Sequence, residues 1–325
     1  MKKTKHIFIT RQIPEEGINL LKEKGYKLTI SKSKRPFAKH ELVKLISKKK
    51  YDGVISLLTD HIDAEFFDAC PTVKIVANYT VGFNNIDIDE AKHRGIKVTN
   101  TRGTSSQAVA EHAVALMLAL TTRLVEGDKF MRKNKFKGWD PNFMMGLDLN
   151  NLTVGIVGAG AIGRTVGKIL NKGFGCKIIY TDATHNESFE NECDAKFMEL
   201  EHLLKEADIV SLHVPLMKET HHLINRERIH MMKKTAILIN TSRGPVVDEM
   251  ALVHALQNNI IYGAGLDVYE HEPEMAPGLS KLTNVVLTPH IASARPSARI
   301  EMSKLAAQNI VSFFEKDGEV ITSVY

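Results

Sequence analysis

The segment at residues 153–167, TVGIVGAGAIGRTVG, restricts the fold of this chain more than any other part of its sequence. A short apolar run with β character leads directly into glycines at 158, 160 and 163, and a helical pattern follows. In such a segment Gly158 allows a tight turn, Gly160 lets the backbone approach a bound group closely, and Gly163 lets the helix pack against the strand. The segment therefore predicts a strand, a turn and a helix that open a doubly wound sheet.

Short apolar runs alternate with amphipathic stretches along most of the chain. Before residue 104 the strand-like runs are 7–10, 28–30, 54–58, 73–77 and 97–100, and the helix-like stretches are 15–24, 39–49, 63–69 and 87–94. From residue 153 onward the strand-like runs are 154–157, 177–181, 209–214, 236–240, 265–268 and 285–288, with helical segments such as 163–171 and 249–258 between them. Repeated strand–helix units of this length predict an α/β protein with two doubly wound parallel sheets.

The length of 325 residues suits about two domains at roughly 150 residues each. Residues 110–122 are apolar all round and are expected to form a buried helix, whereas residues 296–314 place apolar side chains near one face of a helix. Because little chain follows this last helix, we expect it to return to the first series of strands. The predicted domains are residues 1–103 with 291–325, and residues 104–290.

The composition, with 43% hydrophobic and 25% charged residues, is that of an ordinary globular protein. The longest stretch without charged or strongly polar residues, 113–122, is far shorter than the ~18 residues that cross a bilayer. The N-terminus lacks a secretory signal pattern and the three cysteines are scattered, so we expect a reducing compartment, the cytoplasm. The net charge of +5 is spread along the chain, which argues against a nucleic-acid partner.

The glycine motif and the next apolar run together predict a dinucleotide site. A pyrophosphate would lie at the start of the helix, against the backbone of Gly158, Gly160, Ala161, Ile162 and Gly163. Asp182 ends the next apolar run, close to the ~20 residues after the motif at which a carboxylate binds the adenosine ribose. That carboxylate would repel a 2′-phosphate, and residues 183–185 contain no arginine to neutralise one, so the sequence favours NAD over NADP.

Three further motifs follow in order: TSRGPVVD at 241–248, GLDVYEHEP at 265–273 and TPHIAS at 288–293. Together with the glycine motif they resemble the D-isomer-specific 2-hydroxyacid dehydrogenase family over nearly the whole chain. The resemblance implies a flavodoxin-like substrate domain, a Rossmann NAD-binding domain, and a cleft between them. It also implies a homodimer built mainly through the nucleotide domain, with Arg243, Glu272 and His290 as the catalytic residues.

The chemistry of reducing a 2-keto acid calls for these three residue types. Arg243 carries a planar, permanently charged group that matches a carboxylate, so it can orient the substrate and polarise its carbonyl. His290 can donate a proton during reduction or remove one during oxidation. Glu272 would hold the imidazole by a hydrogen bond and favour its charged form.

The resemblance also assigns contacts to the cofactor and the substrate. Contacts to the cofactor would come from the glycine motif, Asp182, Arg243 and His290, and in addition from His213, Val214, Pro215, Thr241, Ser242, Asp267 and Ser293. The run ANYTVGFNNID at 77–87 is similar to the glyoxylate and hydroxypyruvate reductase branch, in which the backbone amides at Val81 and Gly82 would bind the substrate carboxylate. Leu57 would cover the small tail of the substrate, and Trp139 would reach the active site of the neighbouring subunit.

Two alternatives to this function stay open on the sequence alone. Phosphite dehydrogenase shares the same three catalytic residues, and an NAD-sensing co-repressor of transcription would keep the fold without needing turnover. No metal site is expected, because the sequence has no HExxH motif, no paired CxxC motif and no carboxylate-rich calcium loop, and because His221 and His222 lack companion ligands.

Overall fold

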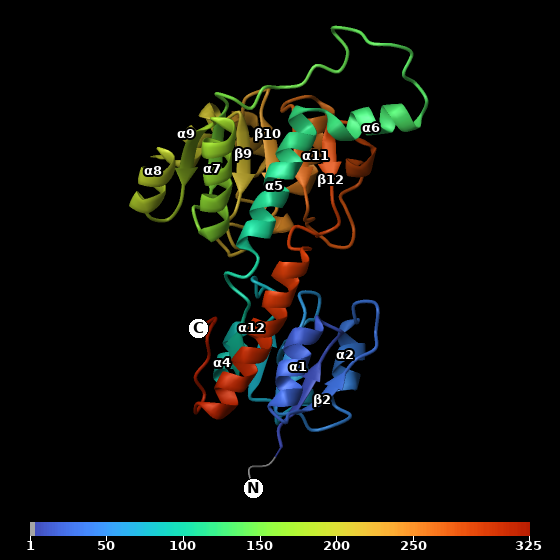
Figure 1. The fold of residues 1–325 in the computed structure, drawn as a ribbon, viewed down its shortest axis with the longest axis vertical. Coiled ribbons are helices and arrows are strands. Elements are labelled where there is room, and N and C mark those ends of the chain that lie inside the picture. The colour runs from blue at the N-terminus through green and yellow to red at the C-terminus, as the bar shows by residue number, and fades with distance from the viewer. Residues whose placement is uncertain (1–3) are drawn as a thin grey trace. The chain divides into compact units, whose positions relative to one another are not determined.

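The computed structural model describes residues 4–325 and divides into two compact units (Figure 1). The first unit is Met1–Ser105 with Ala294–Tyr325, and the second unit is Ser106–Ser293. The boundaries between the two units therefore lie at 105–106 and 293–294, whereas the sequence predicts boundaries at 103–104 and 290–291.

The first unit is built on a five-stranded parallel sheet in the order β2-β1-β3-β4-β5. Its strands are β1 (His6–Ile9), β2 (Lys27–Ile30), β3 (Gly53–Ser56), β4 (Ile75–Asn78) and β5 (Lys97–Thr99). Every residue of β1, β3 and β4 is buried, as in a parallel sheet covered on both faces. The strand order is that of a flavodoxin-like sheet.

The helices of the first unit come from both ends of the chain. They are α1 (Glu15–Glu23), α2 (Lys39–Ile46), α3 (Ala64–Ala69), α4 (Ile88–His93) and α12 (Pro296–Glu315). α12 begins with a proline in its first turn, where the missing N–H costs nothing, and it packs along α1 (Figure 1). At their closest approach the Gly17 amide donates to Ser303 Oγ at 3.1 Å, and a Cβ on Gly17 would lie 2.2 Å from the Ser303 carbonyl oxygen.

The second unit contains a seven-stranded parallel sheet in the order β12-β11-β10-β9-β6-β7-β8. Its strands are β6 (Thr153–Val157), β7 (Lys177–Thr181), β8 (Lys196–Phe197), β9 (Ile209–Leu212), β10 (Ile237–Asn240), β11 (Gly263–Leu266) and β12 (Val285–Leu287). The chain runs outward from β6 to β8 and then restarts beside β6 at β9. This reversal is the switch point at which doubly wound sheets bind dinucleotides.

The helices of the second unit are α5 (Ser106–Thr121), α6 (Leu124–Arg132), α7 (Ala161–Phe174), α8 (Glu187–Cys193), α9 (Leu200–Glu206), α10 (Arg226–Met231) and α11 (Glu249–Gln257). The largely apolar α5 is mostly buried and packs on α7, β10 and β11. Within residues 4–325, no single helix is long and apolar enough to cross a membrane; α5 and α6 meet that test only as a pair bent by 62°.

Candidate active site

The glycine turn after β6 is shaped by sterics that only glycine satisfies. Gly158 has a φ of +95°, and a Cβ on it would lie 2.9 Å from the carbonyl carbon and oxygen of His213. A Cβ on Gly163 would lie 2.1 Å from the Gly158 carbonyl oxygen, so α7 approaches the turn closely. A Cβ on Gly160, by contrast, would meet open space. The turn thus leaves exposed backbone at the start of the 14-residue helix α7, where a pyrophosphate fits.

Asp182 directly follows β7, and its carboxylate is held next to this turn. Its Oδ2 accepts a hydrogen bond from the Ala159 amide at 2.7 Å, and its Oδ1 accepts one from the Ala183 amide at 2.7 Å. The side chain is exposed, so the remaining lone pairs of both oxygens face solvent. An exposed carboxylate beside a glycine turn fits the ribose end of NAD.

His213 lies on the opposite side of the switch point, directly after β9. Its amide donates to the Val157 carbonyl oxygen at 2.7 Å, and its Nε2 lies 2.9 Å from Ser211 Oγ. Burial lowers the pKa of His213 to about 3, so the ring is neutral at physiological pH. His213, Val214 and Pro215 continue from the strand as an irregular segment whose backbone contacts Gly158.

Arg243 is positioned by the turn after β10. The Asn240 side chain binds this turn from within: its Nδ2 donates to the Arg243 carbonyl oxygen at 2.9 Å, and its Oδ1 accepts from the Ser242 amide and hydroxyl. A Cβ on Gly244 would lie 1.9 Å from the Tyr269 carbonyl group, so this turn packs tightly against the segment after β11.

The Arg243 side chain is half-buried, and its guanidinium is only partly satisfied by protein groups. Its Nη1 donates to the Ser242 carbonyl oxygen at 2.6 Å, while the buried Nε has no protein partner. Burial lowers the pKa of Arg243, and the nearby charge of Glu272 opposes that shift. The hydroxyl of Thr241, two residues before, is also buried without a partner. An anionic or carbonyl ligand bound at this strand end would give these two polar groups a partner.

His290 and Glu272 form a hydrogen-bonded pair at the neighbouring strand ends. Glu272 Oε2 lies 2.8 Å from His290 Nδ1, and Glu272 Oε1 accepts from the Tyr269 amide at 3.1 Å. The side chain of His290 is 26% exposed and that of Glu272 is 34% exposed, so the pair can meet a ligand from solution. Because Nδ1 is engaged by the carboxylate, Nε2 is the ring nitrogen that can exchange a proton with a bound molecule.

Asp267, which follows β11, holds the turn that carries His290. Its fully buried carboxylate accepts hydrogen bonds from the Thr288 hydroxyl and from the amides of Ile291 and Ala292, at 2.6, 2.9 and 2.8 Å. Burial raises the pKa of Asp267, but hydrogen bonds from His112, Thr288 and the two amides outweigh it, and the net shift is downward. The structure gives Asp267 a role inside the protein, and its contact to the cofactor stays a prediction, as does that of Ser293.

Glu249 is a structural residue of the site that the sequence analysis missed. It is only 4% exposed, and its carboxylate accepts from the Glu270 amide at 2.6 Å and the Ala276 amide at 2.7 Å. It thereby fixes both ends of the segment that carries Glu272. In the sequence the acid is the first residue of a helix, where carboxylates commonly serve only to complement the helix dipole.

The carboxyl ends of the adjacent strands β10, β11 and β12 thus bring Arg243, Glu272 and His290 to one edge of the second sheet. Leu57 and Val81–Gly82 lie in the first unit, after the carboxyl ends of the neighbouring strands β3 and β4. Trp139 lies after α6, and 83% of its side chain is exposed.

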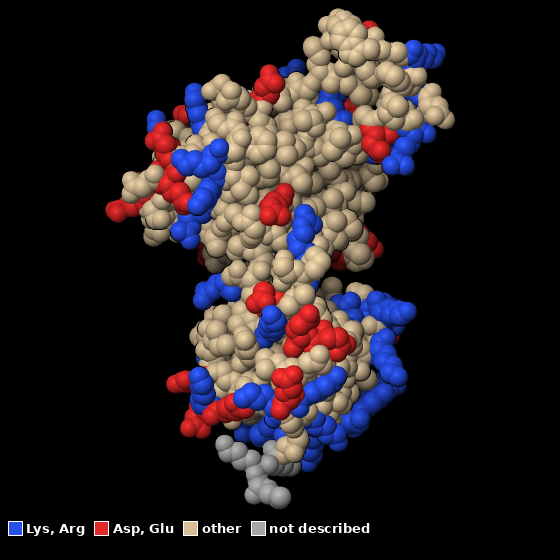
Figure 2. Space-filling model, viewed as in Figure 1, with Lys and Arg blue, Asp and Glu red and all other residues tan. Residues whose placement is uncertain are grey.

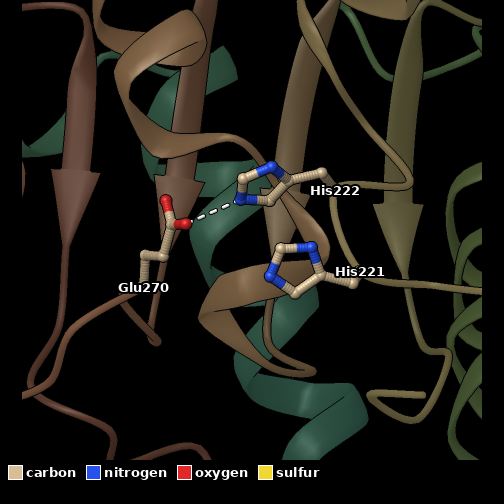
Figure 3. A group of neighbouring side chains, drawn as sticks. All are labelled: His221, His222 and Glu270. Atoms are coloured by element: carbon tan, nitrogen blue, oxygen red, sulfur yellow. Dashed lines mark hydrogen bonds and ion pairs between the residues drawn. The ribbon is translucent and has the colours of Figure 1, made fainter. Parts of the chain in front are cut away.

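The expectation that His221 and His222 lack companion ligands was wrong. His221 and His222 do have a companion ligand, because the fold places Glu270 beside them (Figure 3). Glu270 is 48 residues from His222 in the chain and follows another strand, β11, so no local motif predicts the contact.

Residues 114–292 match the family described as D-isomer specific 2-hydroxyacid dehydrogenase, NAD binding domain. The chain belongs to this family. Among its relatives, the glyoxylate reductase of Korarchaeum cryptofilum is 47% identical over 317 residues, which cover 97% of this chain and 93% of that protein. The glyoxylate reductase of Thermococcus litoralis is 48% identical over 311 residues, 94% of this chain and 93% of that protein. The crystal structure of a glyoxylate reductase from Paecilomyes thermophila has a TM-score of 0.88 at 28% identity, covering 100% of this chain and 99% of that one.

These similarities confirm the family and the α/β architecture with two doubly wound sheets. The 2-hydroxyacid dehydrogenase described here is therefore an enzyme that uses a nicotinamide cofactor, and neither phosphite oxidation nor a purely sensory role is favoured. The open backbone at Gly160 and the carboxylate of Asp182 fit NAD, which supplies the hydride when it is bound as NADH.

Proposed function

We propose that this dehydrogenase reduces glyoxylate, or a 2-keto acid of similar size such as hydroxypyruvate, to the corresponding 2-hydroxy acid with NADH. A single observation carries the proposal: the His290–Glu272 pair, with Nδ1 and Oε2 at 2.8 Å, and the partly unpaired guanidinium of Arg243 lie at the ends of adjacent strands. The names of the relatives at 47 and 48% identity support the choice of substrate class.

Each catalytic residue has one task in the proposed reaction. Arg243 binds the substrate with the donors that the protein leaves unpaired, and its charge polarises the carbonyl bond. His290 would give the proton on Nε2 to the carbonyl oxygen of the substrate, and bound NADH would supply hydride to the carbonyl carbon, so that the aldehyde or ketone gains H⁻ and H⁺ and becomes an alcohol. Glu272 keeps the ring oriented and stabilises its protonated form before the transfer.

The substrate carboxylate is proposed to bind the amides of Val81 and Gly82. Both residues are half-buried. The Asn100 side-chain amide donates to the Val81 carbonyl oxygen at 2.8 Å, in the peptide group that carries the Gly82 amide. The Thr101 amide donates to the Thr80 carbonyl oxygen at 2.9 Å, in the peptide group that carries the Val81 amide. These bonds hold the peptide groups in one orientation, as an anion-binding backbone requires. Leu57 is proposed to cover the substrate tail. Its amide is held by Asp60 at 2.7 Å, and a small 2-keto acid needs little more cover than one such side chain.

We also propose that the enzyme is a homodimer that associates through the second unit. α5 lies on a face of this unit that shows few charged side chains (Figure 2), and the neighbouring α6 and residues 133–145 expose large apolar side chains. A hollow of about 1190 Å³ lies beside α6. Apolar surface of this extent favours burial against a second copy. The exposed apolar side chains are Leu124, Met131, Phe136, Trp139, Phe143 and Met145.

Light scattering coupled to size-exclusion chromatography tests the dimer. We expect twice the chain mass of 36.3 kDa for the wild type. Trp139→Ala is expected to keep the dimer but to lower turnover if Trp139 reaches the partner's site. A monomeric wild type would contradict the proposed association, and normal turnover of the variant would contradict the proposed role of Trp139.

The cysteines support a cytoplasmic location, which we propose on this ground. Cys70, Cys176 and Cys193 are all buried free thiols. Burial raises the pKa of all three, and that of Cys70 to about 12, so the thiols are unreactive. Free thiols without any disulfide are typical of a reducing compartment.

Turnover assays test the proposed function directly. Purified enzyme is mixed with NADH and glyoxylate, hydroxypyruvate or pyruvate, and the loss of NADH absorbance is followed. His290→Ala is expected to lower kcat by ~10²–10⁴-fold with little change in NADH affinity. His230→Ala is the matched control, because this exposed histidine of the same unit bonds only within its own helix. NADH binding without oxidation by any of the three acids would refute the proposal.

A further inference from the structure

His221, His222 and Glu270 form a cluster of metal-ligating side chains that hydride transfer does not use. The two histidines lie in the His loop, residues 213–225, which connects β9 to α10. Glu270 lies in the Glu272 loop, residues 267–276, which follows β11. One ligand atom from each of the three side chains lies within 4.8 Å of the other two (Figure 3).

The local backbone turns both imidazole rings toward the carboxylate. His222 has a φ of +49°, an uncommon conformation for a residue other than glycine, and its amide donates to the Pro245 carbonyl oxygen at 2.8 Å. In an extended chain, neighbouring side chains point to opposite faces. Here the rings of His221 and His222 instead stack, with centroids 4.1 Å apart and planes inclined by 29°. Figure 3 shows both rings on the side of the loop that faces Glu270.

The three side chains differ in how far protein contacts already satisfy them. His222 Nε2 lies 2.6 Å from Glu270 Oε1, and Glu270 Oε2 accepts from the Glu249 amide at 3.2 Å. The ring nitrogens of His221 have no hydrogen-bond partner among residues 4–325, although the ring sits against the pair. A salt bridge alone therefore explains two members of the cluster, and the exposed His221 keeps both ring nitrogens free of protein partners among the described residues.

A divalent transition-metal ion would give all three side chains a role. Two imidazoles and one carboxylate suit Zn²⁺ and similar borderline ions, whereas Mg²⁺ and Ca²⁺ prefer oxygen ligands throughout. A tetrahedral ion with bonds of ~2.0–2.1 Å separates its ligand atoms by roughly 3.3 Å. The Nε2–Oε1 distance of 2.6 Å must therefore open slightly. The side chains of His222 and Glu270 are 35% and 16% exposed, which leaves room for that movement and for a water ligand.

We propose that His221, His222 and Glu270 bind one divalent transition-metal ion, with water completing its coordination. The ion would tie the His loop to the Glu272 loop. The first of these loops begins with His213, Val214 and Pro215, and the second carries Glu272, so the ion stabilises two segments that border the active site. Because none of the three ligands is a catalytic residue, the site is structural, and it exists independently of the substrate of the enzyme.

Binding of Zn²⁺ is measured on untagged full-length protein that has been stripped with a chelator and dialysed. Titration against a chromophoric zinc indicator is expected to show one tight site per chain. Loss of even an outer-shell partner typically costs ~10–100-fold in metal affinity, so His221→Ala, His222→Ala and Glu270→Gln should each bind at least about tenfold more weakly. Mg²⁺ is expected not to compete. Zn²⁺ should also raise the Tm of the wild type but not that of the variants.

His61→Ala serves as the matched control, because His61 also pairs with a carboxylate, Asp63 at 3.2 Å, but lies in the first unit. It is expected to bind Zn²⁺ like the wild type. Circular dichroism confirms that each variant is folded before its affinity is compared. The proposal is overturned if the wild type takes up no stoichiometric Zn²⁺ at micromolar concentration, if any of the three ligand variants binds as tightly as the wild type, or if Mg²⁺ displaces Zn²⁺.

Discussion

Replacing Asp267 by asparagine tests how the turn that carries His290 is held. In the wild type, Oδ1 accepts from the Thr288 hydroxyl and the Ile291 amide, and Oδ2 accepts from the Ala292 amide. An asparagine has the same shape but presents an NH₂ group in place of one oxygen. In either orientation of the side-chain amide, that NH₂ faces the backbone N–H of Ile291 or Ala292, so one buried donor loses its acceptor.

The cost follows from the hydrogen bonds that are lost. A hydrogen bond to a charged group contributes ~1.5–3 kcal/mol, and a buried donor left without a partner costs ~1–3 kcal/mol. Because these two effects partly overlap, we expect Asp267→Asn to lower the free energy of unfolding by ~2–4 kcal/mol at pH 7. Removing the buried charge brings no compensation, since the lowered pKa of Asp267 shows that its hydrogen bonds already outweigh its burial.

The pKa shift also gives the pH dependence of this effect. The folded-state pKa of Asp267 lies below its unfolded value of ~3.9, so its ionised form stabilises the fold above about pH 4. That stabilisation is lost as the pH falls through the folded-state pKa. Asparagine does not titrate, and the difference in stability between wild type and variant should therefore shrink below pH ~4.

Urea unfolding followed by circular dichroism measures the difference at pH 7, 5 and 3.5, and thermal unfolding should show a Tm lowered by ~5–15 °C. Asp248→Asn is the matched control, because Asp248 caps α11 through the Ala251 amide at 2.9 Å and asparagine caps a helix equally well. The control should stay within ~0.5 kcal/mol of the wild type. If Asp267→Asn is as stable as this control, or if its deficit does not shrink in acid, the role assigned to Asp267 is incorrect.

Three further substitutions probe the site. Asp182→Ala removes the carboxylate proposed to bind the 2′-hydroxyl, so the ratio of kcat/KM with NADH to kcat/KM with NADPH should fall by ~10-fold or more. Steady-state kinetics with both cofactors measure this ratio, and an unchanged ratio would exclude the contact. Gly163→Ala should lower the free energy of unfolding by ~1–3 kcal/mol and weaken NADH binding, because the new Cβ would lie 2.1 Å from the Gly158 carbonyl oxygen. Fluorescence titration measures the affinity for NADH, and a normal affinity would mean that α7 can move away. Glu249→Gln should lower the free energy of unfolding by ~1.5–3 kcal/mol and should also lower kcat, because the amide of Glu270 or of Ala276 loses a charged acceptor. A normal kcat in a destabilised variant would show that the order of this loop does not affect catalysis.

The sequence predicts the fold well where patterns are local and strong. The apolar runs of three to six residues locate the central strands of both sheets, and the glycine motif locates β6, its turn and α7. Ends of elements are less predictable. The run 209–214 suggests a strand through Val214, but β9 ends at Leu212, because His213 begins the segment whose backbone contacts Gly158. β8, with only Lys196 and Phe197, is too short to produce a periodic pattern.

In the candidate site, too, residues in local motifs are predictable from the sequence, whereas residues that meet only through the fold are not. Arg243, Glu272 and His290 stand in motifs that follow apolar runs, so strand-end logic and the family resemblance both point to them. The residues that support the site from other loops stand in no such motif. Glu249 is indistinguishable in sequence from an ordinary helix-start acid, and Glu270 meets His222 only because β9, β10 and β11 are neighbours in the sheet. Contacts between loops of different strands depend on tertiary packing, which periodicity does not encode.

The order of synthesis matters for a unit assembled from both ends of a chain. The 188 consecutive residues from Ser106 to Ser293 contain every strand of the seven-stranded sheet, so this part can reach its folded form while the ribosome is still translating the remainder. The strands of the five-stranded sheet emerge earlier, but the core that Ile18 and Leu21 of α1 share with Met302, Ala306 and Ile310 is complete only almost three hundred residues later. Until residues 296–315 have been made, the face of α1 that packs along α12 therefore lacks its partner helix.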